Sequence, residues 1–212
     1  MCLIFGLSRG REDTCPVRTL KSMLGATNAE GQKYVLVLVQ TGPGQRSVLK
    51  MRKATIMEAL ESTAPQPVSL ICTPRPDGGT NLAPVAWWTY LESEPPIIGF
   101  SMAKESYTCE LVSNTGKVAV CLPSESIADQ VLECGGVSGR DVDKAAKHGI
   151  ELTGKSIKYP VHSRLVFVCN VGQKVIVGDC VFFICNVDEI LLDENQRHIY
   201  TMNGSQGLRA VQ

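Results

Sequence analysis

The sequence has no excess of charge of either sign. Its 212 residues include 21 Lys plus Arg and 21 Asp plus Glu, so the formal net charge is zero. A dedicated nucleic-acid-binding protein usually carries a clear positive excess, or at least a basic domain. We therefore expect no nucleic-acid partner.

Long apolar runs are also missing. A transmembrane helix needs about 18 or more consecutive apolar residues. The longest runs here, residues 34–39 and 181–185, have the length of strands. At the N-terminus, the apolar residues 2–7 are too few for a secretory signal and are followed by charged residues. We expect a soluble, cytoplasmic protein without membrane association.

Close cysteine pairs are absent, although cysteine itself is frequent. The nine cysteines are widely spaced, without a CxxC motif. A structural zinc site usually begins with such a pair, so we expect no metal site. Several cysteines fall inside apolar runs, as in residues 118–121 and 166–169, where a reduced cysteine acts as a small hydrophobic residue. We expect buried, reduced thiols in a reducing compartment.

The usual spacings of catalytic residues are missing as well. The three histidines show no HxxH or HExxH spacing, and there is no GxSxG serine motif. Residues 149–156 do match the P-loop string, but a P-loop needs a strand before its first glycine and a helix after its lysine. Here a helical pattern precedes Gly149, and Pro160 disfavours a helix afterwards. We interpret the string as a helix cap and turn, with a nucleotide triphosphatase as the alternative.

The first fifty residues differ from the rest of the chain. They contain seven basic but only three acidic residues. Their strand-like run, residues 33–40, stands between glycine-containing breaks and has no evident partner. We interpret residues 1–50 as a poorly ordered N-terminal extension and residues 51–212 as the folded domain.

The folded domain shows mostly strand patterns. Short apolar runs separated by turn residues favour a β-barrel or a β-sandwich. Helical patterns cover residues 52–62, 124–131 and 141–148, the last with Asp141 at its start and Gly149 as a left-handed cap at its end. We expect a mainly β (α+β) domain with a few short helices. The expected strands are residues 68–72, 85–90, 97–102, 118–122, 165–171, 174–177 and 181–190.

Residues 81–108 carry the most informative chemistry. Residues 81–89 combine an amide, small side chains, two indoles and a hydroxyl near a strand, and a flat ring could approach their peptide groups closely. Residues 101–108 then supply hydroxyls and one lysine before a short helical pattern at 109–112. Hydroxyls, an ammonium group and a helix N-terminus suit a phosphate monoester. The residues alone leave two readings open, a site for a phosphate and a flat ring, or ordinary strand and turn structure.

The combined pattern resembles a known family, the flavin reductase-like, flavoredoxin-type FMN-binding split-barrel proteins. The resemblance covers residues 54–192 in order and does not reach residues 1–50. It implies an FMN-binding split β-barrel, typically a homodimer with the flavin near the subunit interface. It also implies hydride transfer from NADH or NADPH to the flavin, followed by electron delivery to an acceptor, which can be a protein. The segments that carry the resemblance are residues 81–84, 87–89, 95–96, 99–101, 104–108, 137–144 and 178–179.

The resemblance also implies cofactor-binding residues, but no catalytic residue. Residues 81–89 correspond to the part that contacts the isoalloxazine ring, in part through backbone groups. Residues 101–108 correspond to the phosphate and ribityl ligands. The implied set is Asn81, Ala83, Pro84, Val85, Ala86, Trp87, Trp88, Thr89, Ser101, Met102, Lys104, Tyr107 and Thr108.

One position departs from the family pattern. Many flavin reductases of this superfamily carry Gly-Asp-His, with a histidine associated with the nicotinamide, whereas this chain has Cys180 after Gly178 and Asp179. FMN binding is therefore better supported than NAD(P)H turnover. The alternative to an FMN-dependent NAD(P)H:flavin oxidoreductase is a non-catalytic FMN-binding electron carrier that a partner protein reduces.

Overall fold

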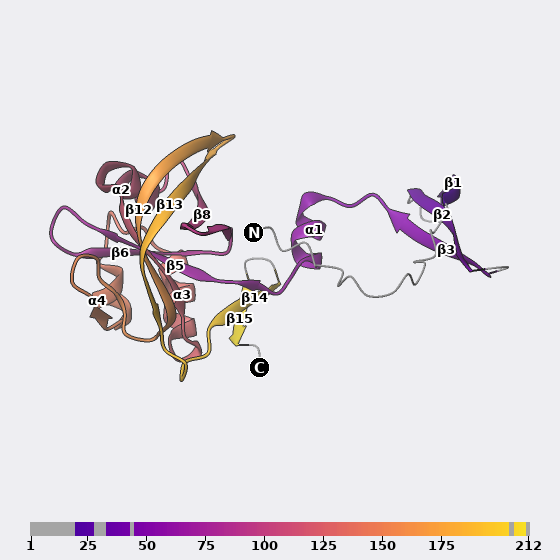
Figure 1. Cartoon of the computed structure of the whole chain (residues 1–212). Coiled ribbons are helices and arrows are strands. Elements are labelled where there is room, and N and C mark those ends of the chain that lie inside the picture. Colours follow the sequence, from indigo (N-terminus) through magenta and orange to yellow (C-terminus); the bar gives the residue numbers. More distant parts are fainter. Residues whose placement is uncertain (1–19, 28–32, 43–44, 204–205, 211–212) are drawn as a thin grey trace, which may run out of the picture. The chain divides into compact units, whose positions relative to one another are not determined.

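The computed structural model describes residues 20–27, 33–42, 45–203 and 206–210, and these form two compact units (Figure 1). One unit ends at Ser62 and the other begins at Thr63. Residues 1–19 of the predicted extension, with Cys2 and Cys15, lie outside the described residues. In the part of the chain that the structure describes, every helix is too short or too polar to cross a lipid bilayer.

The first unit contains a three-stranded antiparallel sheet. Strand β2 (Lys33–Gly42) lies between β1 (Leu20–Thr27) and β3 (Gln45–Arg52), and helix α1 (Ile56–Ser62) follows. The sequence therefore indicated the central strand but not its two neighbours. Met51, the predicted domain boundary, lies inside β3, eleven residues before the last residue of this unit.

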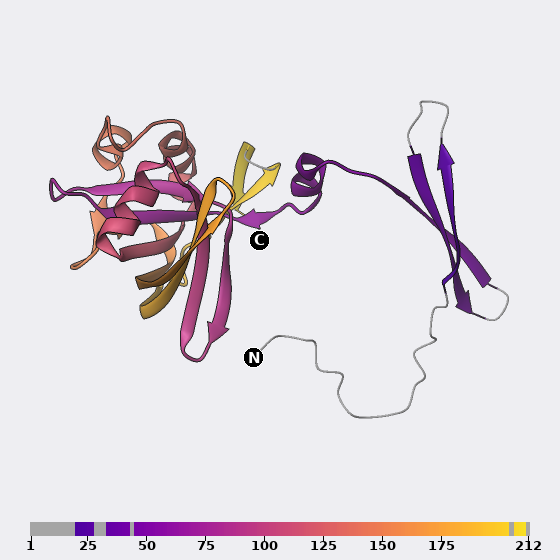
Figure 2. The same ribbon diagram turned by 90° about the horizontal axis from the view of Figure 1, so that it is seen from above.

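The second unit is built on a seven-stranded antiparallel sheet. Its strand order is β6-β5-β9-β12-β13-β8-β7, so that β6 and β7 are its terminal strands. In Figure 2 the long β12–β13 hairpin, drawn in orange, runs beside the β7–β8 hairpin, in agreement with the pairing of β13 and β8. The strands are β5 (Ser69–Pro74), β6 (Thr80–Val85), β7 (Trp88–Ser93), β8 (Pro96–Ala103), β9 (Lys117–Pro123), β12 (Ser163–Val177) and β13 (Cys180–Leu192).

Smaller elements complete this unit. Two further antiparallel sheets are present, one of strands β15-β14-β4 and one of strands β10-β11. These strands are β4 (Gln66–Pro67), β10 (Leu152–Thr153), β11 (Tyr159–Pro160), β14 (Ile199–Asn203) and β15 (Gln206–Ala210). The helices are α2 (Tyr107–Thr115), the 3-10 helix η1 (Glu125–Ile127), α3 (Ala128–Gly135) and α4 (Lys144–His148).

Strands β5 and β9 of the large sheet are buried on both faces. In β5, Ile71 belongs to one hydrophobic cluster, whereas Leu70 and Cys72 belong to another. Helix α2 packs on the first cluster through Val112, and α3 packs on the second through Val131. Side chains alternate between the faces of a strand, so α2 and α3 cover opposite faces of the sheet. The double burial explains why β5 and β9 are continuous apolar runs.

The predicted fold class is confirmed, but three of the predicted strands have other bounds in the structure. The predicted strand 85–90 is the end of β6 and the start of β7, with Ala86 and Trp87 between them. The predicted strands 165–171 and 174–177 form one strand, β12. Its register with β13 shifts between Val171 and Gln173, so Gly172 marks a bulge and not a turn.

The helix predictions differ from the structure mainly at the N-termini. Helix α4 begins at Lys144 because Asp143, not Asp141, accepts a hydrogen bond from the Ala146 N–H through its side chain, at 3.0 Å. Gly149 ends α4 with φ of 64°, the left-handed cap that the sequence predicted. The helix predicted over residues 124–131 is divided into η1 and α3.

The seven cysteines among the described residues are all free thiols. Six are buried and Cys180 is half-buried. Burial raises the pKa of Cys134 to about 11 and that of Cys185 to about 12. These cysteines behave as the predicted small hydrophobic residues.

Candidate functional site

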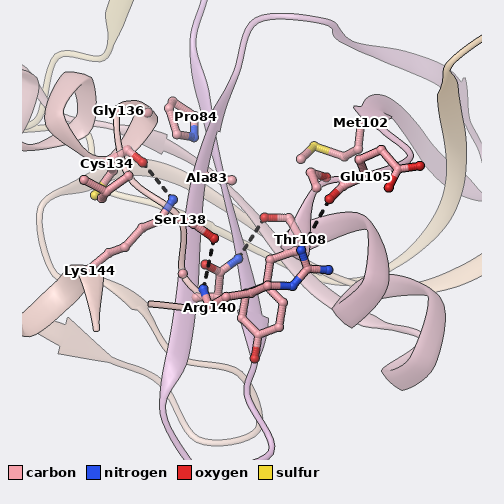
Figure 3. Close-up of a pocket in the computed structure, with 16 residues that line it drawn as sticks. Ala83, Pro84, Met102, Glu105, Thr108, Cys134, Gly136, Ser138, Arg140 and Lys144 are labelled. Carbon is pink, nitrogen blue, oxygen red and sulfur yellow. Dashed lines mark hydrogen bonds between the residues drawn. The ribbon is translucent and has the colours of Figure 1, made fainter. Parts of the chain in front are cut away.

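A cavity of about 350 Å³ lies beside β6. Because β6 is a terminal strand of the large sheet, its outer edge has no strand partner within the described residues. Such an edge presents backbone N–H and C=O groups to its surroundings. The cavity extends from α2 to the α3–α4 region (Figure 3), and its volume falls within the range of small-molecule sites.

The N-terminus of α2 forms one end of the cavity. Ser106 caps this helix, and its Oγ accepts a hydrogen bond from the Cys109 N–H at 3.1 Å. The first amides of a helix have no partner within the helix, and the helix dipole is positive there. Tyr107 and Thr108, which carry these amides, line the cavity. This end of the cavity therefore suits an anion.

A buried amide connects β6 to α2. Asn81, only 1% exposed, donates from Nδ2 to Thr108 Oγ1 at 2.8 Å. Its Oδ1 is buried and has no hydrogen-bond partner among the described residues. Gly139 lies against this oxygen so closely that a Cβ at position 139 would overlap it. The wall beside Thr108 thus holds an unsatisfied acceptor, one of four buried side-chain polar atoms without a hydrogen-bond partner among the described residues.

A buried lysine stands at the opposite end of the cavity. Lys144, the first residue of α4, is 5% exposed and donates from Nζ to the carbonyl oxygen of Cys134 at 2.7 Å. Burial lowers the pKa of the Lys144 ammonium group. Figure 3 shows Lys144 and Cys134 on one side of the cavity, with Met102 and Glu105 on the other.

Arg140 ties the loop after α3 to α2. Its guanidinium pairs with Glu110 and stacks over the Tyr107 ring, 5.3 Å from the ring centroid. The same guanidinium lies 3.5 Å from the carbonyl oxygen of Glu105. Glu110 therefore offsets the charge of Arg140.

The structure brings six of the thirteen predicted cofactor residues together around this cavity. The six are Asn81, Ala83, Pro84, Met102, Tyr107 and Thr108. Two others, Val85 and Ala86, line a neighbouring apolar groove of about 390 Å³ that shares Pro84, Gly135 and Gly136 with the cavity. The remaining five, Trp87, Trp88, Thr89, Ser101 and Lys104, lie outside both.

The two tryptophans have different surroundings. Trp88 donates from its indole N–H to the Pro67 carbonyl oxygen at 3.1 Å, and its ring contacts the rings of Tyr90 and Phe167. This side chain therefore packs against the core. Trp87 is 54% exposed. Lys104 is also exposed, and its backbone N–H donates to the Asp179 carbonyl oxygen at 3.0 Å, which places the turn before Cys180 beside this segment.

Most residues on the α3–α4 side of the cavity were not predicted from the sequence. The segment 137–144 carried part of the family resemblance, but no binding role was assigned to it. The signal was present in the sequence as three glycines, a serine and an arginine close together, ahead of a lysine. The lining residues outside the predicted set are Glu105, Ser106, Cys134, Gly135, Gly136, Val137, Ser138, Gly139, Arg140 and Lys144.

The P-loop-like string forms no phosphate-binding loop. Gly149 ends α4, and the string continues into the two-residue strand β10, which pairs with β11. No helix follows Ser156 before β11 in this fully described stretch. The helix-cap interpretation of this string is therefore confirmed.

Comparisons with known proteins agree with this fold. The family model described as "Flavin reductase like domain" matches residues 61–208. The uncharacterized protein YddH of Escherichia coli is 34% identical over 70 residues, 33% of this chain and 37% of YddH, so the match spans little more than a third of that relative.

Solved structures show the same architecture. A flavoredoxin from Methanosarcina acetivorans superposes with a TM-score of 0.63 at 21% identity, over 70% of this chain and 86% of that protein. The flavoredoxin of Desulfovibrio vulgaris gives 0.64 at 21% identity, over 71% and 88%. At these identities the likeness shows the fold, and it confirms the predicted split barrel.

Proposed function

Because the chain belongs to the flavin reductase-like domain family, we propose that it is an FMN-dependent oxidoreductase whose cavity beside β6 binds the flavin. In this proposal the cavity residues would hold FMN, which would supply the hydride chemistry between NADH or NADPH and an electron acceptor. The proposal rests on one observation: the N-terminus of α2 and the outer edge of β6 border the same cavity.

The residues around the cavity fit the two ends of FMN. Thr108 and the first amides of α2 offer donors to a phosphate. Ala83 and Pro84 have small side chains, so a flat ring can approach the edge of β6 closely. These residues bind and orient the cofactor, and the bound flavin supplies the hydride chemistry.

FMN fits better than FAD because the cavity offers one compact anion site. A pyrophosphate usually calls for a longer glycine-rich cradle at a helix N-terminus. We expect yellow protein from which denaturation releases FMN, identified by chromatography. Released FAD, or a colourless protein that takes up no FMN, would contradict the proposal.

Lys104 remains a proposed phosphate ligand even though it does not line the cavity. Its exposed side chain starts two residues before the Ser106 cap, and the flexible stem can bring the ammonium group to the α2 N-terminus. A charge-assisted hydrogen bond contributes about 1.5–3 kcal/mol, so Thr108→Ala and Lys104→Ala should each weaken FMN binding clearly in a titration. If only Thr108→Ala has an effect, the phosphate is bound without Lys104.

A second candidate function is an FMN-binding electron carrier, and Cys180 favours it. Cys180 begins β13 opposite Ala103 of β8, where a thiol is a weaker donor and acceptor than an imidazole. Under anaerobic conditions NADH or NADPH should bleach a reductase, whereas a carrier needs dithionite or a partner protein.

Cys180→His should raise kcat/KM for NAD(P)H in a poor reductase and leave FMN affinity unchanged. If the wild-type protein already oxidises NAD(P)H rapidly, Cys180 does not limit nicotinamide binding. The same conclusion follows if Cys180→His melts at a lower temperature without a gain in rate.

We also propose a homodimer with the flavin near the subunit interface. The support is that apolar side chains are exposed on β7 and at the end of β12, because exposed apolar surface can take part in association. Sedimentation of the purified protein measures the assembly state. The exposed apolar residues are Tyr90, Leu91, Val175, Ile176 and Val177.

A further inference from the structure

Arg75 does not line the cavity, but it is bonded to the loop that does. It follows β5, in the turn to β6, and its side chain is only 14% exposed. Its Nη1 donates to the carbonyl oxygen of Val142 at 3.1 Å. Val142 immediately precedes the Asp143 cap of α4, in the loop after α3 whose residues 137–140 line the cavity. A long side chain of the β5–β6 turn therefore fixes one backbone position of the loop that forms the cavity wall.

The turn between β5 and β6 holds the guanidinium of Arg75 in place. Backbone hydrogen bonds join Arg75 to Gly78 and Gly79, at 3.1 and 2.9 Å. Arg75 Nη2 donates to Asp77 Oδ2 at 2.7 Å, and the other oxygen of this carboxylate accepts from the Gly79 N–H at 3.0 Å. The hydrogen bond from Gly79 and the charge of Arg75 lower the pKa of Asp77, so the carboxylate is charged at pH 7. These bonds direct the Arg75 side chain toward the loop.

Stability of the fold alone is a poor explanation for this arginine. A guanidinium loses its hydration on burial, and removal of such a cost by an apolar side chain is often neutral or stabilising. Arg75 Nε is buried without a hydrogen-bond partner among the described residues. Thr73 Oγ1 and Asn81 Oδ1, which belong to register partners on β5 and β6, are buried in the same unsatisfied state. The arginine is better explained by the position that it gives to the loop.

We propose that Arg75 is a positioning residue for the flavin, which holds the loop of residues 137–143 against β6 in the arrangement that binds FMN. This inference rests on the proposed binding of FMN in the cavity. If only a fraction of the molecules holds the binding arrangement, the apparent Kd rises by the inverse of that fraction. Arg75 therefore acts on FMN through Val142 and not by contact.

Arg75→Met removes both side-chain hydrogen bonds and keeps an unbranched stem. Arg164→Met is the matched control, because Arg164 Nη1 also donates to a backbone carbonyl oxygen, that of Asp193, at 2.9 Å, and Arg164 does not line the cavity. FMN titrations of the wild type and both variants give the affinities. We expect Arg75→Met to bind FMN at least about tenfold more weakly, which corresponds to a binding arrangement held by about a tenth of the molecules. The control should keep the wild-type affinity.

Amide hydrogen exchange separates positioning of the loop from a general loss of stability. In Arg75→Met without FMN, the amides of residues 137–148 should exchange faster than in the wild type, while those of β9 and β12 keep their protection. Saturating FMN should restore the protection of residues 137–148, because the ligand selects the binding arrangement. Faster exchange throughout the unit, with no recovery on addition of FMN, refutes the inference.

The possible outcomes distinguish this inference from the proposed function. Failure of the wild type to bind FMN refutes both. If the wild type binds FMN and Arg75→Met binds it equally well, the role of Arg75 alone is refuted, even where the variant melts at a lower temperature. Equal losses of FMN affinity in Arg75→Met and Arg164→Met also refute the inference.

Arg75→Lys covers the case in which Arg75→Met does not fold. The lysine keeps the charge, but its ammonium group lacks the fork with which the guanidinium reaches Val142 and Asp77 together. We then expect FMN binding about threefold weaker than in the wild type, which is half of the tenfold loss on a logarithmic scale. Wild-type affinity and wild-type exchange of residues 137–148 in Arg75→Lys would refute the inference in that case.

Discussion

In the wall of the cavity, Gly139 packs closely against Asn81 and Tyr107. The Asn81 Oδ1 and the edge of the Tyr107 ring lie where a side chain at position 139 would begin. The same loop supplies Arg140, whose guanidinium stacks over the Tyr107 ring. A glycine at this point therefore lets the loop after α3 pack directly on β6 and α2, and the cavity takes its shape from this contact.

Gly139→Ala tests this packing. The added methyl group must displace Asn81 or the loop, and overpacking costs about 1–3 kcal/mol. In a chain of this size each kcal/mol corresponds to about 2–4 °C in Tm. We expect a lower Tm for Gly139→Ala in a thermal melt. Gly136→Ala is the control because its Cβ would meet only the Glu133 carbonyl oxygen at 3.5 Å, and equal melting of the two variants would contradict the proposed packing.

At the scale of elements, the sequence predicted the large sheet better than the site. Strands β5 and β9 are buried on both faces, so their residues form apolar runs that are visible without a structure. The α3–α4 side of the cavity has no such pattern, because its contribution depends on glycines and on the one buried lysine, Lys144. Strands β1 and β3 were also missed. Their sequences mix polar and apolar residues, and only the pairing with β2 identifies them.

The start of α4 illustrates how a short element positions a functional side chain. The sequence pattern predicted Asp141 as the cap of this helix. In the structure Asp143 is the cap, which makes Lys144 the first helical residue and directs its side chain to Cys134.

Asp143→Ala and Asp141→Ala form a matched pair of tests. Loss of an N-cap costs about 0.5–2 kcal/mol, so Asp143→Ala should lower Tm measurably. It should also weaken FMN binding if the first turn of α4 frays, since Lys144 lies in that turn. Asp141→Ala should leave both properties unchanged. If Asp141→Ala lowers Tm more than Asp143→Ala does, Asp141 is the cap of α4, as the sequence predicted.

At the scale of the whole molecule, the proposed flavin site lies within one of the two units. The residues that line the cavity fall between Asn81 and Lys144, and both core clusters begin at or after Val68. The family match begins at residue 61, close to the division between the units at Ser62 and Thr63. Met51, the boundary predicted from the sequence, would cut through β3. The unit from Thr63 onward contains the whole of the proposed flavin site.

A chain that begins at Thr63 should therefore fold and bind FMN as the full chain does. The truncation removes β1, β2, β3 and α1 but keeps β4, whose register with β14 closes the small sheet of this unit. Folded segments that contribute few contacts to a core can be removed without loss of that core. Thermal melts and FMN titrations of the truncated and full chains provide the measurement, and we expect a cooperative melt and an unchanged FMN affinity. If the truncated chain folds but loses FMN, the first unit takes part in the site. If it does not fold at all, the two units depend on each other for stability, and the domain division proposed here is wrong.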